Sequence, residues 1–138
     1  MYSFEIKREL NFTNLREAFF QTVSNSSWAH EGYLAAAEID TDEEFREELG
    51  RLSASFGIGI IQLDIEDPES SQILFFSEKA DKKLDWDTLN KLANNADVKH
   101  LIKHIKNNVT TNEIVKEFYD CVLGPEELLE SIRQLKQP

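Results

Sequence analysis

Apolar and polar residues alternate at the start of the chain, with the two-residue period of a half-buried β-strand over residues 2–7. One side of this predicted strand carries the apolar side chains of Tyr2, Phe4 and Ile6. The other side carries the polar side chains of Ser3, Glu5 and Lys7. A carboxylate and an ammonium group are therefore expected to stand side by side on one face of a sheet.

The period then changes to that of a helix, which we expect to run from Asn14 to about Trp28. Asn14 and Glu17 have the spacing of a capping box, in which side chains bond the free amide groups of the first turn. An apolar run over residues 33–39 follows, and it is typical of a strand in the interior of a sheet.

A second helix is predicted from Thr41, which forms another capping box with Glu44, to the break at Phe56-Gly57. Two more strands are expected after it, separated by a turn: 58–63 and 72–76. Helices between successive strands imply right-handed crossovers. The fold class is therefore α/β, with a small mixed, mainly parallel sheet, flanking helices and a final hairpin.

Beyond the sheet, the spacing of apolar residues is helical. It predicts four helices: around 86–92, from an N-cap at Asp97 to Ile105, from Thr110 to Val122, and around 128–135. We expect one domain over 1–138, with an α/β sheet core (1–78), a charged link (Ser77–Lys83) and an all-helical C-terminal extension (84–138).

Charge is distributed unevenly along this chain of 138 residues, whose net charge is −11. Residues 1–70 carry 15 acidic and 5 basic residues, a charge of −10, whereas residues 71–138 carry 11 and 10, a charge of −1. An even basic coat for binding nucleic acid is therefore absent. No apolar run is long enough to span a membrane, and the single cysteine, Cys121, excludes an internal disulfide and fits the cytoplasm. We expect Cys121 to be a buried, unreactive thiol.

Glu5 and Lys7, with Gln21 on the following helix, form the first candidate site. A carboxylate holds a hard cation such as Mg²⁺, while a lysine orients or polarises the attacking water and neutralises developing charge. This set suits magnesium-dependent hydrolysis of a phosphodiester. The same residues also fit a solvated ion pair with no chemical role. In the first case one helix face is expected to present four residues to the pair: Gln21, Ser24, Asn25 and Trp28.

The order of three segments carries a family resemblance: the strand Ser3–Lys7, the helix Leu15–Gln21 and the strand from Gly32 to Leu34. It resembles the core of the PD-(D/E)XK restriction-endonuclease-like superfamily, in which a helix that often carries a glutamine follows the motif strand. Three further runs are similar to the C-terminal module of uncharacterised bacterial proteins associated with restriction loci: Gln21–Ala29, Phe56–Gly59 and Leu84–Trp86. The resemblance covers about residues 1–105.

The resemblance implies DNA hydrolysis with Mg²⁺, in which Glu5 is the metal ligand, Lys7 the water-activating cation and Gln21 the group that positions Lys7 or a phosphate. In the family the first metal-binding aspartate lies on a strand before the motif strand, and no residue upstream of Met1 supplies it here. Asp40 and Asp64 end later strands and are expected to act as capping or turn residues. The resemblance therefore implies a truncated, catalytically incomplete module, inactive alone or completed by a partner.

His100 and His104 are a second candidate, since residues four apart on a helix can reach one metal ion. Leu101 stands where a zinc protease has its glutamate, and lysines surround the pair, so we interpret the segment as an amphipathic helix with a basic outer face.

Two functions from different classes remain open. One is the restriction-endonuclease-like module of a bacterial restriction or defence locus, acting on DNA. The other is an acidic protein-interaction module without chemistry, which binds a basic protein partner through the charge of residues 1–70 and the acid-rich stretch 38–48.

Overall fold

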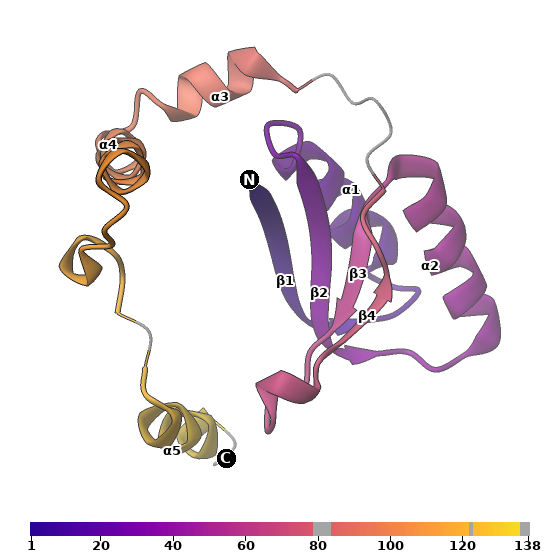
Figure 1. The fold of residues 1–138 in the computed structure, drawn as a ribbon. Helices are drawn as coiled ribbons and strands as arrows, with labels where there is room; N and C mark the ends of the chain where they lie inside the picture. The colour runs from indigo at the N-terminus through magenta and orange to yellow at the C-terminus, as the bar shows by residue number, and fades with distance from the viewer. Residues whose placement is uncertain (79–83, 122, 136–138) are drawn as a thin grey trace. The chain divides into compact units, whose positions relative to one another are not determined.

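The structure, a computed structural model, describes residues 1–78, 84–121 and 123–135. The chain divides into two compact units, Met1–Asp85 and Trp86–Pro138. The first unit contains the sheet and confirms the predicted α/β class, and the second is helical (Figure 1). Most of the link predicted over Ser77–Lys83 lies outside the described residues.

The sheet of the first unit has four strands in the order β1-β2-β3-β4. The strands are β1 (Tyr2–Leu10), β2 (Glu31–Ile39), β3 (Gly59–Gln62) and β4 (Gln72–Phe75). β1 pairs with β2 and β2 with β3 in parallel, whereas β3 and β4 pair antiparallel. The predicted pairing of β1 beside β2 and the final hairpin, whose turn contains the short helix η1 (Pro68–Ser70), are both confirmed.

Helices α1 (Leu15–Asn25) and α2 (Glu43–Phe56) cover the same face of this sheet (Figure 1). Both lie in crossovers between neighbouring parallel strands, and right-handed crossovers that advance in one direction place their helices on one side. The core lies between these helices and the two middle strands. Its largest buried apolar side chains are Phe19, Phe45, Leu10, Leu34, Leu49, Ile58 and Ile60.

Neither predicted capping box is formed. Asn14 makes no capping bond to α1, because its amide accepts from the backbone nitrogen of Asn11 and donates to the carbonyl of Glu9. The N-cap of α2 is Asp42 and not Thr41, since the Asp42 carboxylate accepts from the backbone nitrogen of Phe45 at 3.1 Å. The predicted end of α2 at Gly57 is confirmed, because Gly57 takes the left-handed conformation (φ 67°) that glycine tolerates best.

The two sides of β1 are reversed relative to the usual rule for a half-buried strand. Its polar side faces α1, whereas its apolar side is exposed, with exposed fractions of 60% for Tyr2, 55% for Phe4 and 67% for Ile6. The reason is the position of the strand: β1 lies at the edge of the sheet, beneath the polar residues Gln21 and Asn25 of α1.

The second unit contains α3 (Trp86–Leu92), α4 (Ala96–Thr111) and α5 (Pro125–Leu135). The N-cap of α4 is Asn95 and not Asp97, because the Asn95 side chain accepts from the backbone nitrogens of the first turn. The helix predicted from Thr110 is wrong over the described residues. α4 continues through Thr111 to a left-handed Asn112, and the described part of the predicted helix beyond Asn112 contains only the short helix η2 (Lys116–Phe118). Val122, where that predicted helix ends, lies outside the described residues.

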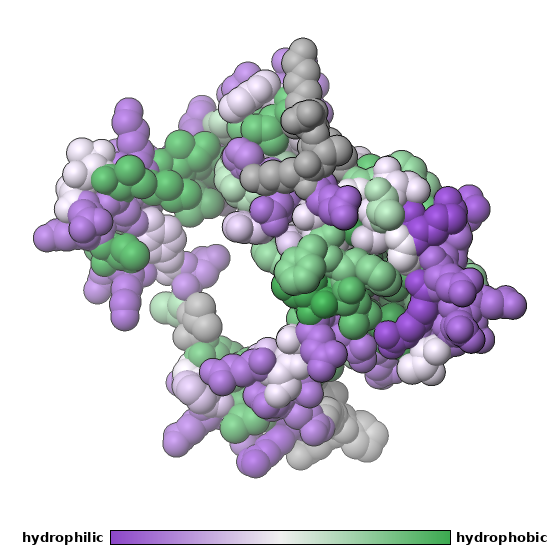
Figure 2. Space-filling model, turned by 45° about the vertical axis from the view of Figure 1, so that its right-hand side comes forward, coloured by the Kyte–Doolittle hydropathy of each residue, from purple (hydrophilic) through white to green (hydrophobic). Residues whose placement is uncertain are grey.

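The amphipathic helix predicted around Val98–Ile105 exists as part of α4, but its apolar residues are not buried. Leu101, Ile102 and Ile105 are each close to half exposed. In the space-filling view, apolar side chains reach the surface on both units (Figure 2). Each unit therefore presents apolar side chains at its surface.

Candidate functional site

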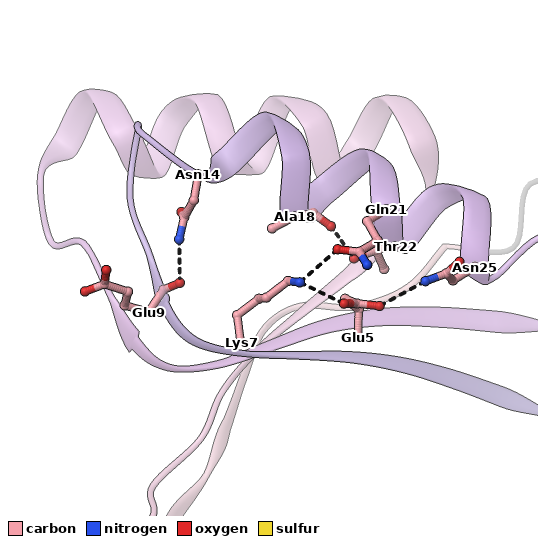
Figure 3. Close-up of polar contacts among 8 residues, drawn as sticks. All are labelled: Glu5, Lys7, Glu9, Asn14, Ala18, Gln21, Thr22 and Asn25. Atoms are coloured by element: carbon pink, nitrogen blue, oxygen red, sulfur yellow. Dashed lines mark hydrogen bonds and ion pairs between the residues drawn. The ribbon is translucent and has the colours of Figure 1, made fainter.

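The predicted residues Glu5, Lys7 and Gln21 come together between β1 and α1 (Figure 3). Lys7 Nζ lies 2.9 Å from Glu5 Oε1 and donates to Gln21 Oε1 at 2.8 Å. Asn25 Nδ2 donates to the other oxygen of the same carboxylate, Glu5 Oε2, at 3.1 Å. The four side chains thus form one continuous hydrogen-bonded row.

Local sequence spacing explains this row. Glu5 and Lys7 are two residues apart on a strand, so both side chains point to the same face of the sheet. Gln21 and Asn25 are four residues apart on α1, so they lie one turn apart on the same helix face. The crossover from β1 to β2 carries α1 back over its own strand. Gln21 then lies over Lys7, and Asn25 lies over Glu5.

The Glu5 carboxylate is held in its ionised form. The exposed fractions of the side chains are 17% for Glu5 and 29% for Lys7, so water reaches both only in part. The hydrogen bond from Lys7, supported by that from Asn25 and opposed by desolvation, lowers the pKa of Glu5 below its ordinary value. At neutral pH the site is therefore a carboxylate already paired with an ammonium group.

The predicted helix face is only partly realised. α1 ends at Asn25, so Trp28 lies beyond the helix and is not on the same stripe as Gln21. Ser24 is exposed, and no hydrogen bond of its side chain is described. Asn25 lies on the predicted face and contacts the pair through Glu5, because its four-residue step from Gln21 places both amides over β1.

As a metal centre the row offers few ligands. Glu5 is its one carboxylate, and within the described ranges no group of three or more His, Cys, Asp or Glu side chains is placed to hold a metal ion. Mg²⁺ is bound in proteins by one or two carboxylates with substrate phosphates and several waters. The donor set alone is thus too small for a protein-held Mg²⁺, and a second carboxylate or a phosphate would have to complete it.

Asp40 and Asp64 have the local roles expected of turn residues. Asp40 Oδ1 accepts from the backbone nitrogen of Asp42, and Asp64 Oδ1 accepts from those of Glu66 and Asp67. Asp40 also lines a depression of about 320 Å³ at the carboxyl ends of β1 and β2, together with Glu9 and Glu38. Three acidic side chains there give this end of the sheet a negative surface.

His100 and His104 line a cavity of about 560 Å³ in the second unit. The ring of His104 stacks on that of Phe118, with centroids 4.1 Å apart. Asp97, Glu117 and Asp120 line the same cavity, but they are not among any group placed to hold a metal. Cys121 is exposed, so the expectation of a buried thiol is wrong. It follows a short segment that is almost wholly exposed, where little apolar packing is available.

Comparison with known proteins adds no family to this picture. No protein-family model, no curated protein and no solved structure matches the chain. Among the helices that the structure describes, none is long and apolar enough to cross a membrane. The row formed by Glu5, Lys7, Gln21 and Asn25 is therefore the feature of the chain that bears on its function.

Proposed function

We propose that the chain is a restriction-endonuclease-like module of a bacterial restriction or defence locus, acting in the cytoplasm, whose catalytic site is incomplete without a partner. The observation that supports this proposal is the hydrogen bond between Lys7 Nζ and Gln21 Oε1, beside Glu5. Gln21 lies on the helix that follows the motif strand and bonds the lysine, which is the role that the resemblance to the superfamily implies for this glutamine.

The proposed roles follow from the contacts. Glu5 is the one side chain of the row that would ligate Mg²⁺, which when bound supplies charge neutralisation at a scissile phosphate. Lys7 is held by Glu5 and Gln21 in a defined position, where its ammonium would orient a water molecule or contact a phosphate oxygen. Gln21 is a positioning residue in this scheme, because it acts through Lys7.

Paramagnetic Mn²⁺, a substitute for Mg²⁺, tests the metal role of Glu5. We expect millimolar Mn²⁺ to broaden the amide NMR signals around Glu5 and Gln21, and Glu5→Gln to abolish this broadening. The matched control is Glu48→Gln, which removes a carboxylate that is also ion-paired, to Arg51 on α2. If the broadening at Gln21 survives Glu5→Gln, or is lost equally in the control, Glu5 is not a metal ligand.

Cleavage of duplex DNA by the chain alone is expected to be at or below detection with Mg²⁺ or Mn²⁺. A single carboxylate leaves the metal too weakly held for catalysis without another ligand. Robust cleavage that is lost in Lys7→Ala would show that the site is complete as it stands and that the chain is an enzyme by itself.

A second candidate function is an acidic module that binds a basic protein. It is favoured by the charge of −10 on residues 1–70 and by the negative depression lined by Glu9, Glu38 and Asp40. Complementary charge would govern association, so binding would weaken as salt is added. The two candidates separate on Glu38→Lys: this change impairs binding of a basic partner but leaves Mn²⁺ broadening at Gln21 intact.

A further inference from the structure

The outer edge of β1 is long and is not paired with another described strand. β1 is nine residues long, contains no proline and lies at one end of the strand order, so its only pairing partner among the described strands is β2. The backbone groups on its other edge are a template for pairing with a further strand. Three large apolar side chains on the same strand, Tyr2, Phe4 and Ile6, are more than half exposed.

The sequence of β1 is complementary to itself when two copies run antiparallel about Ile6. In that register Glu5 of each copy lies opposite Lys7 of the other, and Ile6 lies opposite Ile6. Phe4 lies opposite Arg8, where a guanidinium can stack on an aromatic ring. Residues opposite each other on antiparallel strands have Cβ atoms about 4.5–5.5 Å apart, close enough for each pair to interact.

Other symmetric registers bring like groups together. Pairing centred on Glu5, Lys7 or Arg8 places that charged residue opposite its own copy, which is destabilising. Pairing centred on Phe4 places Glu5 opposite Ser3 and leaves Glu5 and Lys7 without an opposite charge on the other strand. A shift by one residue would set the polar side of one strand against the apolar side of the other. Only the register about Ile6 pairs both charges.

Glu5 and Lys7 can each bond one more group, as this pairing requires. Lys7 Nζ has two described partners, Glu5 and Gln21, and an ammonium group has three donors. The carboxylate of Glu5 accepts from Lys7 and Asn25 and has lone pairs left on both oxygens. Both side chains remain partly exposed beneath α1.

From this edge and its charge pattern we propose that the chain forms a homodimer in which the β1 strands of two copies pair antiparallel about Ile6, joining their sheets into one. The occupant is a second copy because the complementary charges are those of β1 itself. This inference rests on the fold of the first unit alone and does not depend on the proposed nuclease function.

The test uses charge reversal in the full chain, followed by sedimentation velocity over a concentration series. Glu5→Lys puts lysine opposite lysine at two places in the dimer, and Lys7→Glu puts glutamate opposite glutamate. We expect each variant alone to dimerise roughly 10-fold to 100-fold more weakly than the natural chain. Mixing the two variants restores opposite charges at both places, so the mixture is expected to form a heterodimer near the natural affinity.

The heterodimer keeps the test independent of local effects. Each variant loses its own Glu5–Lys7 ion pair, and mixing cannot repair that loss within one chain. Circular dichroism of each variant shows that it is folded. The matched control is Glu48→Lys with Arg51→Glu, the corresponding mixture for an ion pair on α2, for which dimerisation should not change.

A crosslink reports the register directly. In a Cys121→Ser background, Ile6→Cys is expected to form a disulfide dimer on mild oxidation, whereas Arg8→Cys, on the same side of β1, is not. A chain that stays monomeric at all concentrations overturns the proposal. So does a dimer that is unaffected by the single variants, or a mixture that fails to recover, since either result places the interface elsewhere.

Discussion

Lys7 shows how the position of one side chain can be fixed by two elements at once. Its ammonium lies within hydrogen-bonding distance of Glu5 on its own strand and Gln21 on the next helix. An isolated Glu–Lys pair on a strand loses most of its attraction to solvent and to side-chain entropy. The amides of Gln21 and Asn25 reduce both losses, because they fix the two charged groups and shield them in part.

Replacement of Lys7 by methionine tests that view at the residue scale. We expect Lys7→Met to lower the free energy of unfolding by about 0.5–1 kcal/mol at pH 7. The pKa of Glu5 is lowered in the folded chain, so the pair stabilises above the ordinary carboxyl range, around pH 4–5. That stabilisation is lost as the pH falls through the lower, folded pKa. Urea denaturation at several pH values should therefore show the two chains converging in acid.

The control for this change is Arg51→Met. It removes an ion pair within one helix, in which the Arg51 side chain is 59% exposed, so a smaller loss of stability than for Lys7→Met is expected. A difference between Lys7→Met and the natural chain that is as large at pH 3 as at pH 7 would mean that packing of the lysine stem, not its charge, is what the strand requires.

Gly59 is a second residue whose identity has a single physical reason. A Cβ at this position would lie 2.2 Å from Tyr33 Cε1 and 2.7 Å from the backbone nitrogen of Ser77. The ring of Tyr33 also stacks on Phe4, with centroids 5.7 Å apart, which limits how far it can move. Only glycine leaves room for this ring.

Gly59→Ala is therefore expected to destabilise the first unit by about 1–3 kcal/mol, the usual cost of overpacking. Thermal unfolding followed by tyrosine fluorescence measures it. Gly50→Ala is the contrast, because its Cβ would meet only the ring of Phe75 at 3.1 Å and alanine favours the helix. Equal losses in the two variants would contradict this account of Gly59.

At the scale of elements, each strand and helix is placed by what it can bury. β2 and β3 supply the apolar residues beneath the helices, and α2 covers them with Phe45, Leu49 and Leu52. β1 lies at the edge of the sheet and contributes only its last residue, Leu10, to this core, because the side that faces α1 is polar. This is why one edge strand holds both the candidate site and the exposed apolar row.

The N-terminus of α2 gives a prediction at this scale. Asp42 accepts from the backbone nitrogen of Phe45, whose ring is fully buried in the core. Asp42→Ala should lower the free energy of unfolding by about 1 kcal/mol, the usual value for an N-cap. Thr41→Ala, one residue earlier, should change it by less than about 0.5 kcal/mol. Urea denaturation of both decides which residue caps the helix, and a larger loss for Thr41→Ala would reverse the assignment.

At the scale of the whole molecule, the dominant property is the negative net charge. The chain carries a net charge of −11, and most of that charge lies on residues 1–70, the part that holds the candidate site. A phosphate backbone that approaches Glu5 and Lys7 must overcome this field. The module proposed above is therefore one that needs a partner to bring DNA to it.

Binding to a labelled DNA duplex is consequently expected to be absent. Fluorescence anisotropy at about 150 mM salt should show no binding up to about 100 µM protein, because few cations face the phosphates and few counterions would be released. Affinity in the micromolar range that falls steeply with salt would show that the basic residues of the second unit outweigh the acidic first unit.

Much of the fold follows from local pattern. The alternation over 2–7, the apolar runs of β2 and β3, and Gly57 at the end of α2 each report short-range preferences, so the order of elements through β4 could be predicted. The end of α4 could not be predicted in this way, and the helix expected to begin at Thr110 is wrong. Thr110 and Glu113 have capping spacing, but α4 runs through Thr111, and a spacing rule cannot show that a helix is still in progress.

The sequence by itself determined the α/β class, the pairing of Glu5 with Lys7 on one side of a strand, and the negative charge of residues 1–70. Only the tertiary structure decided that this polar side faces α1 and that Tyr2, Phe4 and Ile6 are left outside. Alternation gives a strand two distinct sides but does not say which is covered. That depends on where the strand lies in the sheet and on which helix crosses it, and both are set by contacts between residues far apart in the chain.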